Sequence, residues 1–147
     1  MADIRFMNNG GNEEQGIYRS LEYAVKIAEH AVPADRGVVF WSPAHRAEDH
    51  TDQRRVIAVR VPGEGVYEIE DRHWIYEWWQ NLPADVRDSL AADPGKVLTG
   101  DEIVAVTNTR PHAMRAASVA FVDAEDSDEG RYRLFQDEQH FIRAMTS

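Results

Sequence analysis

The sequence contains no cysteine, which excludes disulfides, thiolate metal sites and cysteine nucleophiles. It also has no apolar run near the ~18 residues that a membrane-spanning helix requires. Residues 1–11 lack the basic leader and apolar core that characterise a signal peptide. These absences predict a cytoplasmic protein that does not enter a membrane.

Basic residues are few, and acidic residues outnumber them. The chain has 16 Lys and Arg residues against 26 Asp and Glu residues, which gives a formal net charge of −10. Nucleic-acid phosphates repel a chain this acidic, so nucleic-acid binding is not expected. The charge favours neutral ligands, or a protein target with a basic surface.

The predicted elements indicate an α+β fold. With 147 residues, the chain fits a single globular domain spanning 1–147. The expected strands cover residues 2–7, 37–41, 55–61, 66–70, 96–98, 102–106, 118–122 and 131–135. The expected helices cover residues 21–32, 71–80, 83–92 and 112–117, while residues 136–145 form a strand or a helix. Because the strands cluster, we expect a mostly antiparallel mixed sheet with three to four helices.

Two local patterns refine this expectation. Residues 55–61 alternate between two faces, and the turn Pro62-Gly63-Glu64-Gly65 joins them to the next strand as a β-hairpin. Gly63 and Gly65 lack the third glycine of a phosphate-binding loop, and their place between two strands is typical of a hairpin. Residues 45–54 are polar, which predicts a surface loop or a short helix.

The first candidate site combines Tyr18-Arg19-Ser20 with Trp41-Ser42. The first group lies where a short extended segment enters a helix, and the second lies at the end of a buried strand. An arginine in such a place can bind a pyrophosphate with two hydrogen bonds, and a serine beside an aromatic ring can orient a ring and a ribose. The alternative is that Arg19 is a surface charge and Ser20 a helix cap.

The second candidate site is the acidic segment of residues 123–133, which contains Asp126, Asp128 and Glu129. Carboxylates at a strand edge can act as a general base or stabilise an oxocarbenium ion, as they do in glycosyl-bond chemistry. The alternative is a solvated acidic turn between two strands.

Histidine and tryptophan form two further groups. His45, Asp49 and His50 could gather around a divalent metal, but histidines five residues apart do not share a helix face, so no metal site is predicted. Trp74, Trp78 and Trp79 lie on a predicted helix and are expected in the core or at a partner interface. Three tryptophans in six residues cannot all face one side, so we expect one to be exposed as a partner contact.

Four segments together resemble a small ADP-ribosyltransferase-like domain. They are GIYRSLEYAVKIAEHAV, GVVFWSPAHRAED, RRVIAVRVPGEGVYEIE and SVAFVDAEDSDEGRYRLFQDEQHFIR. The first two are similar to that family's arginine-bearing strand with its helix and to its aromatic, serine-rich second strand. The last also resembles the ending of small phage anti-CRISPR members of the group.

The resemblance implies that the protein uses NAD to modify a macromolecular target. Arg19 would then lie near the NAD phosphates, with Tyr18 and Ser20 beside it in the cofactor-binding set. Trp41 and Ser42 would lie beside the nicotinamide. The catalytic acid would be Asp126, Asp128 or Glu129.

The composition also supports a second hypothesis, that of a non-enzymatic acidic interaction or inhibitor protein of the phage or mobile-element type. The net charge of −10, the acidic segment and the tryptophan-rich helix all favour docking on a basic surface. A relative of the same fold without catalytic activity is a third possibility, because fold does not imply function.

Overall fold

The computed structural model describes residues 4–8, 17–46, 51–69, 74–110, 122–123 and 132–146. In chain order its elements are β1 (Arg5–Asn8), α1 (Leu21–Ala31), β2 (Val38–Arg46), β3 (Thr51–Val61), β4 (Gly65–Glu68), α2 (Ile75–Asn81), α3 (Ala84–Ala92), α4 (Gly100–Thr109), β5 (Val122–Asp123), β6 (Tyr132–Arg133) and α6 (Gln136–Thr146). Every strand pair among these residues is antiparallel. The α+β prediction is therefore confirmed.

The main sheet has four strands in the order β1-β2-β3-β4, so β2 and β3 are central. The predicted hairpin is the β3–β4 pair, in which Val61 lies opposite Gly65. Its turn needs Gly63 and Gly65, whose φ angles of 78° and 116° are rarely adopted by other residues. The short edge strand β1 was also predicted, and it pairs with β2.

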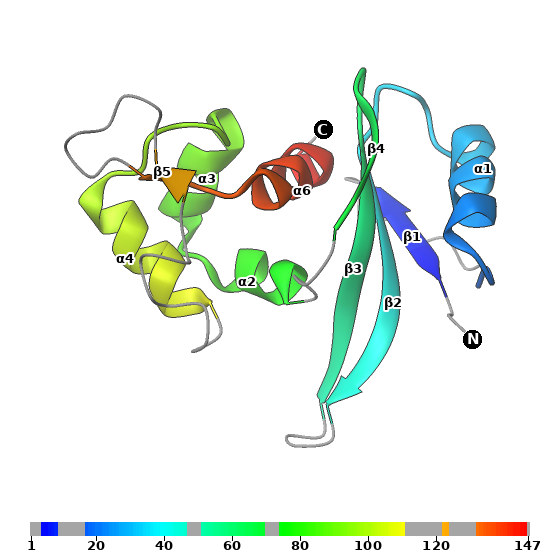
Figure 1. The fold of residues 1–147 in the computed structure, drawn as a ribbon, viewed down its shortest axis with the longest axis horizontal. Coiled ribbons are helices and arrows are strands. Elements are labelled where there is room, and N and C mark those ends of the chain that lie inside the picture. The colour runs from blue at the N-terminus through cyan, green and yellow to red at the C-terminus, as the bar shows by residue number, and fades with distance from the viewer. Residues whose placement is uncertain are drawn as a thin grey trace.

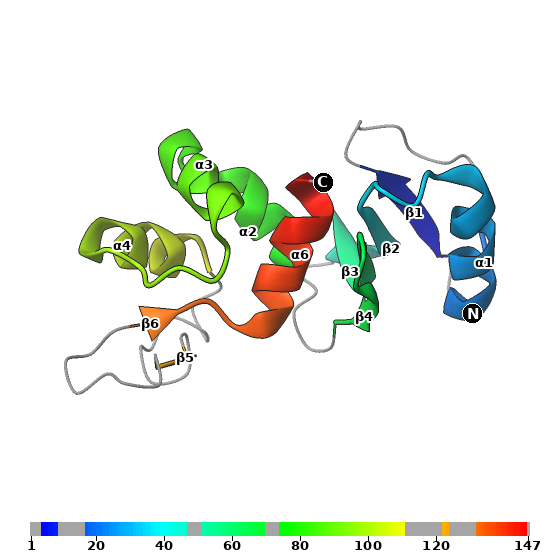
Figure 2. The same cartoon turned by 90° about the horizontal axis from the view of Figure 1, so that it is seen from above.

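The sheet lies between two helical layers (Figures 1 and 2). On one face, α1 packs over β1 and β2. The other face is covered by α6 and α2, with α3 and α4 farther from the sheet. The core under α1 consists of Ile4, Phe6, Ala24, Ala28, Val32, Val38, Phe40 and Ala58. The core on the other face includes Val39, Trp41, Val56, Val59, Ile75, Trp78, Leu90, Phe141 and Ile142.

A β-bulge in β3 changes which of its side chains reach each core. The register places Phe40 opposite Ala58 but Trp41 opposite Val56, so Ile57 is an extra residue. As a result, Val56 joins the core on the α2 and α6 side, whereas Ile57 packs with the core under α1. The predicted regular alternation of residues 55–61 was therefore wrong at this point.

Arg60 of β3 anchors the end of α1. Its guanidinium donates hydrogen bonds of 2.7 Å to the carbonyl oxygen of Pro33 and 2.9 Å to that of Arg36. Carbonyls at and beyond a helix C-terminus lack helical donors, so a cation there satisfies them and complements the helix dipole. Small Ala24 and Ala28, both fully buried, face the sheet and allow α1 to approach it closely.

Two sequence predictions on the first half of the sheet and on α4 were wrong. Residues 45–46 and 51–54, predicted as part of a loop or a short helix, are strand, since β2 continues to Arg46 and β3 begins at Thr51, while residues 47–50 lie outside the described residues. Residues 102–106 are helical within α4 and not a strand. A capping box explains the helix, because the Thr99 side chain accepts from the Glu102 backbone while the Glu102 side chain accepts from the Thr99 backbone.

The C-terminal predictions had mixed outcomes. Residues 96–98 form no strand, although Leu98 N donates a 2.8 Å bond to Tyr132 O. Residues 136–145, left open as strand or helix, form α6. The strands predicted at 118–122 and 131–135 overlap β5 at residue 122 and β6 at residues 132–133, whereas residues 134–135 are not in a strand. The predicted helix at 112–117 lies outside the described residues.

A buried ion pair joins α4 to α6. The Arg110 guanidinium donates to both carboxylate oxygens of Glu138 at 2.5 and 2.7 Å, and both side chains are fully buried. Glu138 also accepts a 3.1 Å bond from the Phe135 backbone at the start of α6. The guanidinium carbon of Arg110 lies 6.0 Å from the ring centre of Trp78 in α2. This one cation at the end of α4 therefore contacts both α2 and α6.

We expect Arg110→Met to lower the free energy of unfolding by about 3–5 kcal/mol, because it leaves a buried carboxylate without its cation. Arg110→Met/Glu138→Gln should recover part of that loss, because glutamine is neutral and still offers an oxygen to Phe135 N. Urea unfolding of the three proteins measures both effects. A double variant no more stable than Arg110→Met would contradict the explanation.

We also expect Gly37→Ala to destabilise the protein, by about 1–3 kcal/mol or more. A Cβ at Gly37 would lie 1.9 Å from the carbonyl oxygen of Ala144, so α6 would have to move away from the start of β2. Gly100→Ala is the matched control, because no atom lies within 4 Å of its added Cβ. Equal thermal stability of the two variants would show that this close approach does not constrain the fold.

Candidate functional site

The predicted phosphate-binding residues lie at the N-terminus of α1. Tyr18 is paired with Ile4 through two 2.8 Å backbone hydrogen bonds, and its ring stacks on Phe6 with centroids 5.8 Å apart. The Ser20 hydroxyl accepts from Tyr23 N at 3.2 Å, which confirms the helix cap. Arg19 is exposed. The structure thus brings the three together, with Ser20 capping the helix.

The predicted nicotinamide-binding residues lie on β2. Trp41 is only 5% exposed, and the guanidinium carbons of Arg5 and Arg54 lie 5.5 and 4.7 Å from its ring centre. Its ring belongs to the core shared with α2 and α6. Ser42 follows it in the strand and is half-buried.

The two groups are not brought together. Tyr18 packs with the core under α1, whereas Trp41 packs with the core on the opposite face of the sheet. The predicted catalytic acids Asp126, Asp128 and Glu129 lie outside the described residues. An NAD site therefore stays a prediction.

The histidine group is only partly described. His45 lies in β2, while Asp49 and His50 are outside the described residues. In the part of the chain that the structure describes, no three His, Asp or Glu side chains gather as metal ligands.

The tryptophans of the α2 segment are all core residues. Trp74, Trp78 and Trp79 are 8%, 1% and 6% exposed, so the expected exposed tryptophan is wrong. Two surfaces cover them, because Trp78 Nε1 donates to Val106 O of α4 at 3.4 Å while the helix also packs on β3. A helix enclosed from two sides can bury aromatic side chains around most of its circumference.

Glu102 lies at the centre of a polar cluster that sequence reasoning did not identify. Its carboxylate accepts from the Ser89 hydroxyl at 2.6 Å, from Lys96 Nζ at 3.1 Å and from Thr99 N at 2.9 Å. Burial alone would raise the pKa of Glu102, but these hydrogen bonds outweigh it and lower the pKa to about 2. The ionised group ties α3 and the segment after it to α4. The Thr-x-x-Glu spacing at Thr99 was the available sequence signal.

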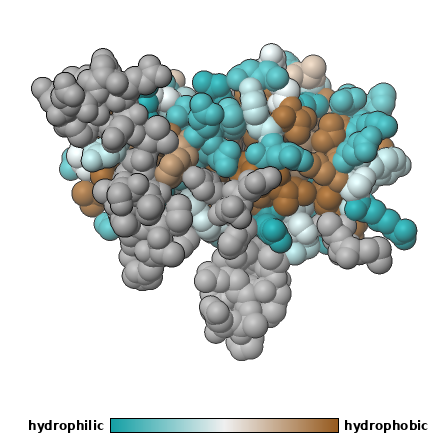
Figure 3. Space-filling view, viewed as in Figure 1, coloured by the Kyte–Doolittle hydropathy of each residue, from teal (hydrophilic) through white to brown (hydrophobic). Residues whose placement is uncertain are grey.

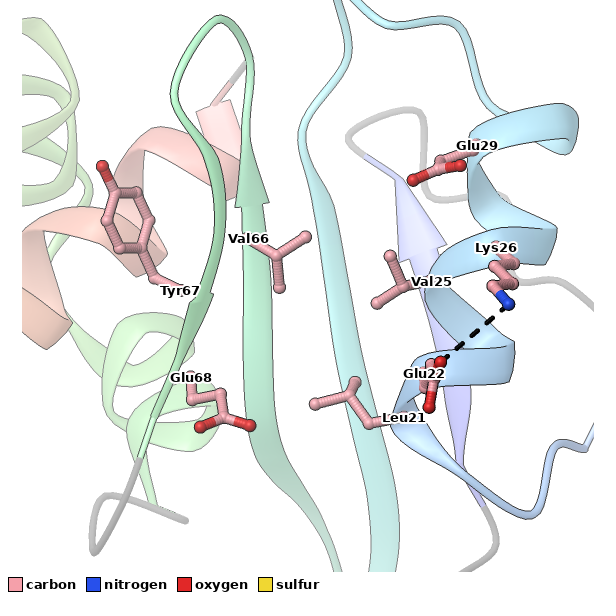
Figure 4. Close-up of a pocket in the computed structure, with 8 residues that line it drawn as sticks. All are labelled: Leu21, Glu22, Val25, Lys26, Glu29, Val66, Tyr67 and Glu68. Atoms are coloured by element: carbon pink, nitrogen blue, oxygen red, sulfur yellow. Dashed lines mark ion pairs between the residues drawn. The ribbon is translucent and has the colours of Figure 1, made fainter.

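A groove lies between α1 and β4 (Figure 4). It has a volume of about 650 Å³ and arises because α1 lies over β1 and β2, beside the face of β4. Leu21 and Val25 of α1 face Val66 of β4 across it (Figure 4). The space-filling view shows apolar surface between the β3–β4 hairpin and α1 (Figure 3).

Carboxylates line both walls of the groove. Glu22 and Glu29 lie on α1, Glu68 lies on β4, and all three are exposed. The one cation in the lining, Lys26, lies 3.9 Å from Glu22, and this exposed pair is weak. The groove is therefore apolar at its floor and negative at its rim.

The strand period explains the β4 wall. Val66 and Glu68 point into the groove, whereas Tyr67 points to the other face and stacks on His140 of α6 with centroids 3.7 Å apart. The alternation of side chains along a strand could have placed Val66 and Glu68 on one face of β4. It could not have shown that α1 leaves them uncovered, because that depends on where α1 packs.

No protein-family model, curated protein or solved structure matches this chain. None of the helices in the described ranges combines the length and the hydropathy that crossing a bilayer requires.

We expect Glu102→Gln to lower the free energy of unfolding at neutral pH by about 1–3 kcal/mol, through loss of charged hydrogen bonds. Since the native pKa of about 2 is below the ordinary 4.5, the wild-type contribution is complete above pH 4.5 and is lost as the pH falls toward 2. The stability difference between wild type and variant should therefore shrink across that window. Asp101→Asn, in the same turn but exposed, is the control. A pH-independent difference would refute this assignment.

Proposed function

We propose that the protein is a non-enzymatic, acidic protein-interaction domain that binds a basic segment of a partner protein in the α1–β4 groove. The observation that carries the proposal is one surface with an apolar floor of Leu21, Val25 and Val66 and a carboxylate rim. Apolar area supplies affinity when it leaves water, and charge selects the sign of the partner.

The floor supports binding because its side chains are not fully used by the fold. Val66 is 39% exposed, and Leu21 and Val25 are half-buried. An apolar surface rimmed by polar groups is typical of an interaction site. The groove is open to the surface and not enclosed, which suits a polypeptide segment better than a small molecule.

The charge of the whole chain supports the same partner. A net charge of −10 attracts basic surfaces from a distance, and Glu22, Glu29 and Glu68 provide the local negative charge. Such complementarity raises association rates and weakens with salt.

The ADP-ribosyltransferase hypothesis makes a different demand. It requires saturable NAD binding that Arg19→Ala abolishes, whereas groove binding requires neither NAD nor Arg19. Calorimetric titration of the wild-type protein and of Arg19→Ala with NAD separates the two hypotheses. Saturable NAD binding by wild type, lost in the variant, would favour the enzyme.

The groove itself is tested with labelled Leu/Lys peptides of about 14 residues, in several sequence orders, by fluorescence anisotropy at low salt. We expect at least one peptide to bind. Glu22→Gln/Glu29→Gln/Glu68→Gln should weaken that binding by about 10-fold or more, because it removes three rim charges of up to ~1 kcal/mol each.

The matched control is Asp85→Asn/Asp88→Asn/Asp101→Asn, which changes the net charge equally on exposed positions of α3 and α4. It should retain most of the affinity. Equal losses in the two triple variants would show that net charge acts without a site, and absence of binding to every peptide would overturn the proposal.

A further inference from the structure

We infer that the groove receives an amphipathic helix of about three turns, which lies beside α1 across β3 and β4. This inference rests on the proposed function and specifies its partner: a helix with an apolar stripe flanked by Lys or Arg.

The width of the sheet provides the first argument. Four strands spaced about 4.8 Å apart place β1 and β4 about 14 Å from each other. Helices pack side by side at about 8–10 Å, so such a face is wide enough for two. In the described residues α1 packs mainly on β1 and β2, and the core beneath it extends to Ile57 and Ala58 of β3. A second helix placed about 8–10 Å from α1 would therefore lie over the β4 side of the face.

The spacing of the rim acids provides the second argument. Glu22 and Glu29 lie seven residues apart on α1, which is about 10.5 Å along the helix axis. Lys or Arg residues seven apart on a neighbouring helix repeat at the same distance and on the same face. Residues on one face of a strand repeat at about 6.7 Å, so neither one nor two repeats match the acids.

The floor provides the third argument. Leu21 and Val25 are four residues apart and form a short apolar ridge on α1, with Val66 opposite them. Apolar residues of a guest helix at i, i+3 or i+4, and i+7 can pack against these three side chains. Since α1 has 11 residues and is about 16 Å long, a guest of about three turns spans the groove.

Addition of a strand to the free edge of β4 is the competing mode. β4 has four residues and starts at Gly65, which has a positive φ of 116°. So short an edge offers few backbone groups to a guest strand, and short edges are one way in which proteins prevent strand addition. Val66 and Glu68 point across the face of the sheet, which favours a guest on the face.

The test compares two Leu/Lys peptides of identical composition and length. One has leucines at helical spacing and lysines seven apart, and its isomer alternates leucine and lysine as a strand does. A third peptide carries proline at the centre of the helical pattern. We expect the helical peptide to bind at least 10-fold more tightly than the other two, and to gain helical circular dichroism when bound.

Variants locate the bound helix. Val66→Lys should lower the affinity for the helical peptide at least 10-fold, and the milder Val66→Thr should lower this affinity less. Val104→Lys is the control, because Val104 is 59% exposed on α4 and the net charge is equal. Far-UV circular dichroism of each free variant verifies its fold.

The outcomes separate the two proposals. If the alternating isomer binds as tightly as the helical peptide and the rim variants weaken both, the helical guest is overturned while the proposed function stands. If Val66→Lys and Val104→Lys behave alike, the guest does not lie on this face. If no Leu/Lys peptide binds in any sequence order, both proposals fail.

Discussion

Burial of both faces of β2 and β3 is the constraint on which the rest of the structure depends. Val38 and Phe40 lie in the core under α1, while Val39 and Trp41 lie in the core on the opposite face. A sheet with two apolar faces must be covered twice, and this chain covers them unequally. Helices α2 and α6 pack on one face, while in the described part of the chain α1 is the helix that packs on the other. The open groove follows from this asymmetry.

Helices can pack on both faces of the sheet because of two local backbone features and one buried ion pair. The bulge at Ile57 turns Val56 toward the core on the α2 and α6 side, and Gly37 allows the end of α6 to reach the start of β2. The Arg110–Glu138 pair then fixes α4 relative to α6. Buried ion pairs contribute little net stability compared with apolar residues, so we attribute to this pair the specification of one helix arrangement.

The elements that could be predicted are those whose signals are local. Ser20 before an amphipathic run indicated α1, and the glycine turn indicated the β3–β4 hairpin. α4 was missed because its β-branched Ile103, Val104 and Val106 suggested a strand. Of the candidate sites, the local cap at Ser20 was predictable. The position of Trp41 on the face opposite Tyr18, and the groove, could not be predicted, because both depend on how distant segments pack.

The modest size of the groove floor suits reversible binding. Val66 is the most exposed of the three apolar side chains, at 39%. The empty groove therefore does not leave a large apolar surface in contact with water. Only the exposed part of each side chain can contribute on binding, at about 25 cal/mol per Å². Affinity from so small a floor is limited, and the carboxylate rim then determines which partners associate and how fast. A guest helix held by so small an apolar area is expected to bind as a transient partner and not as a permanent subunit.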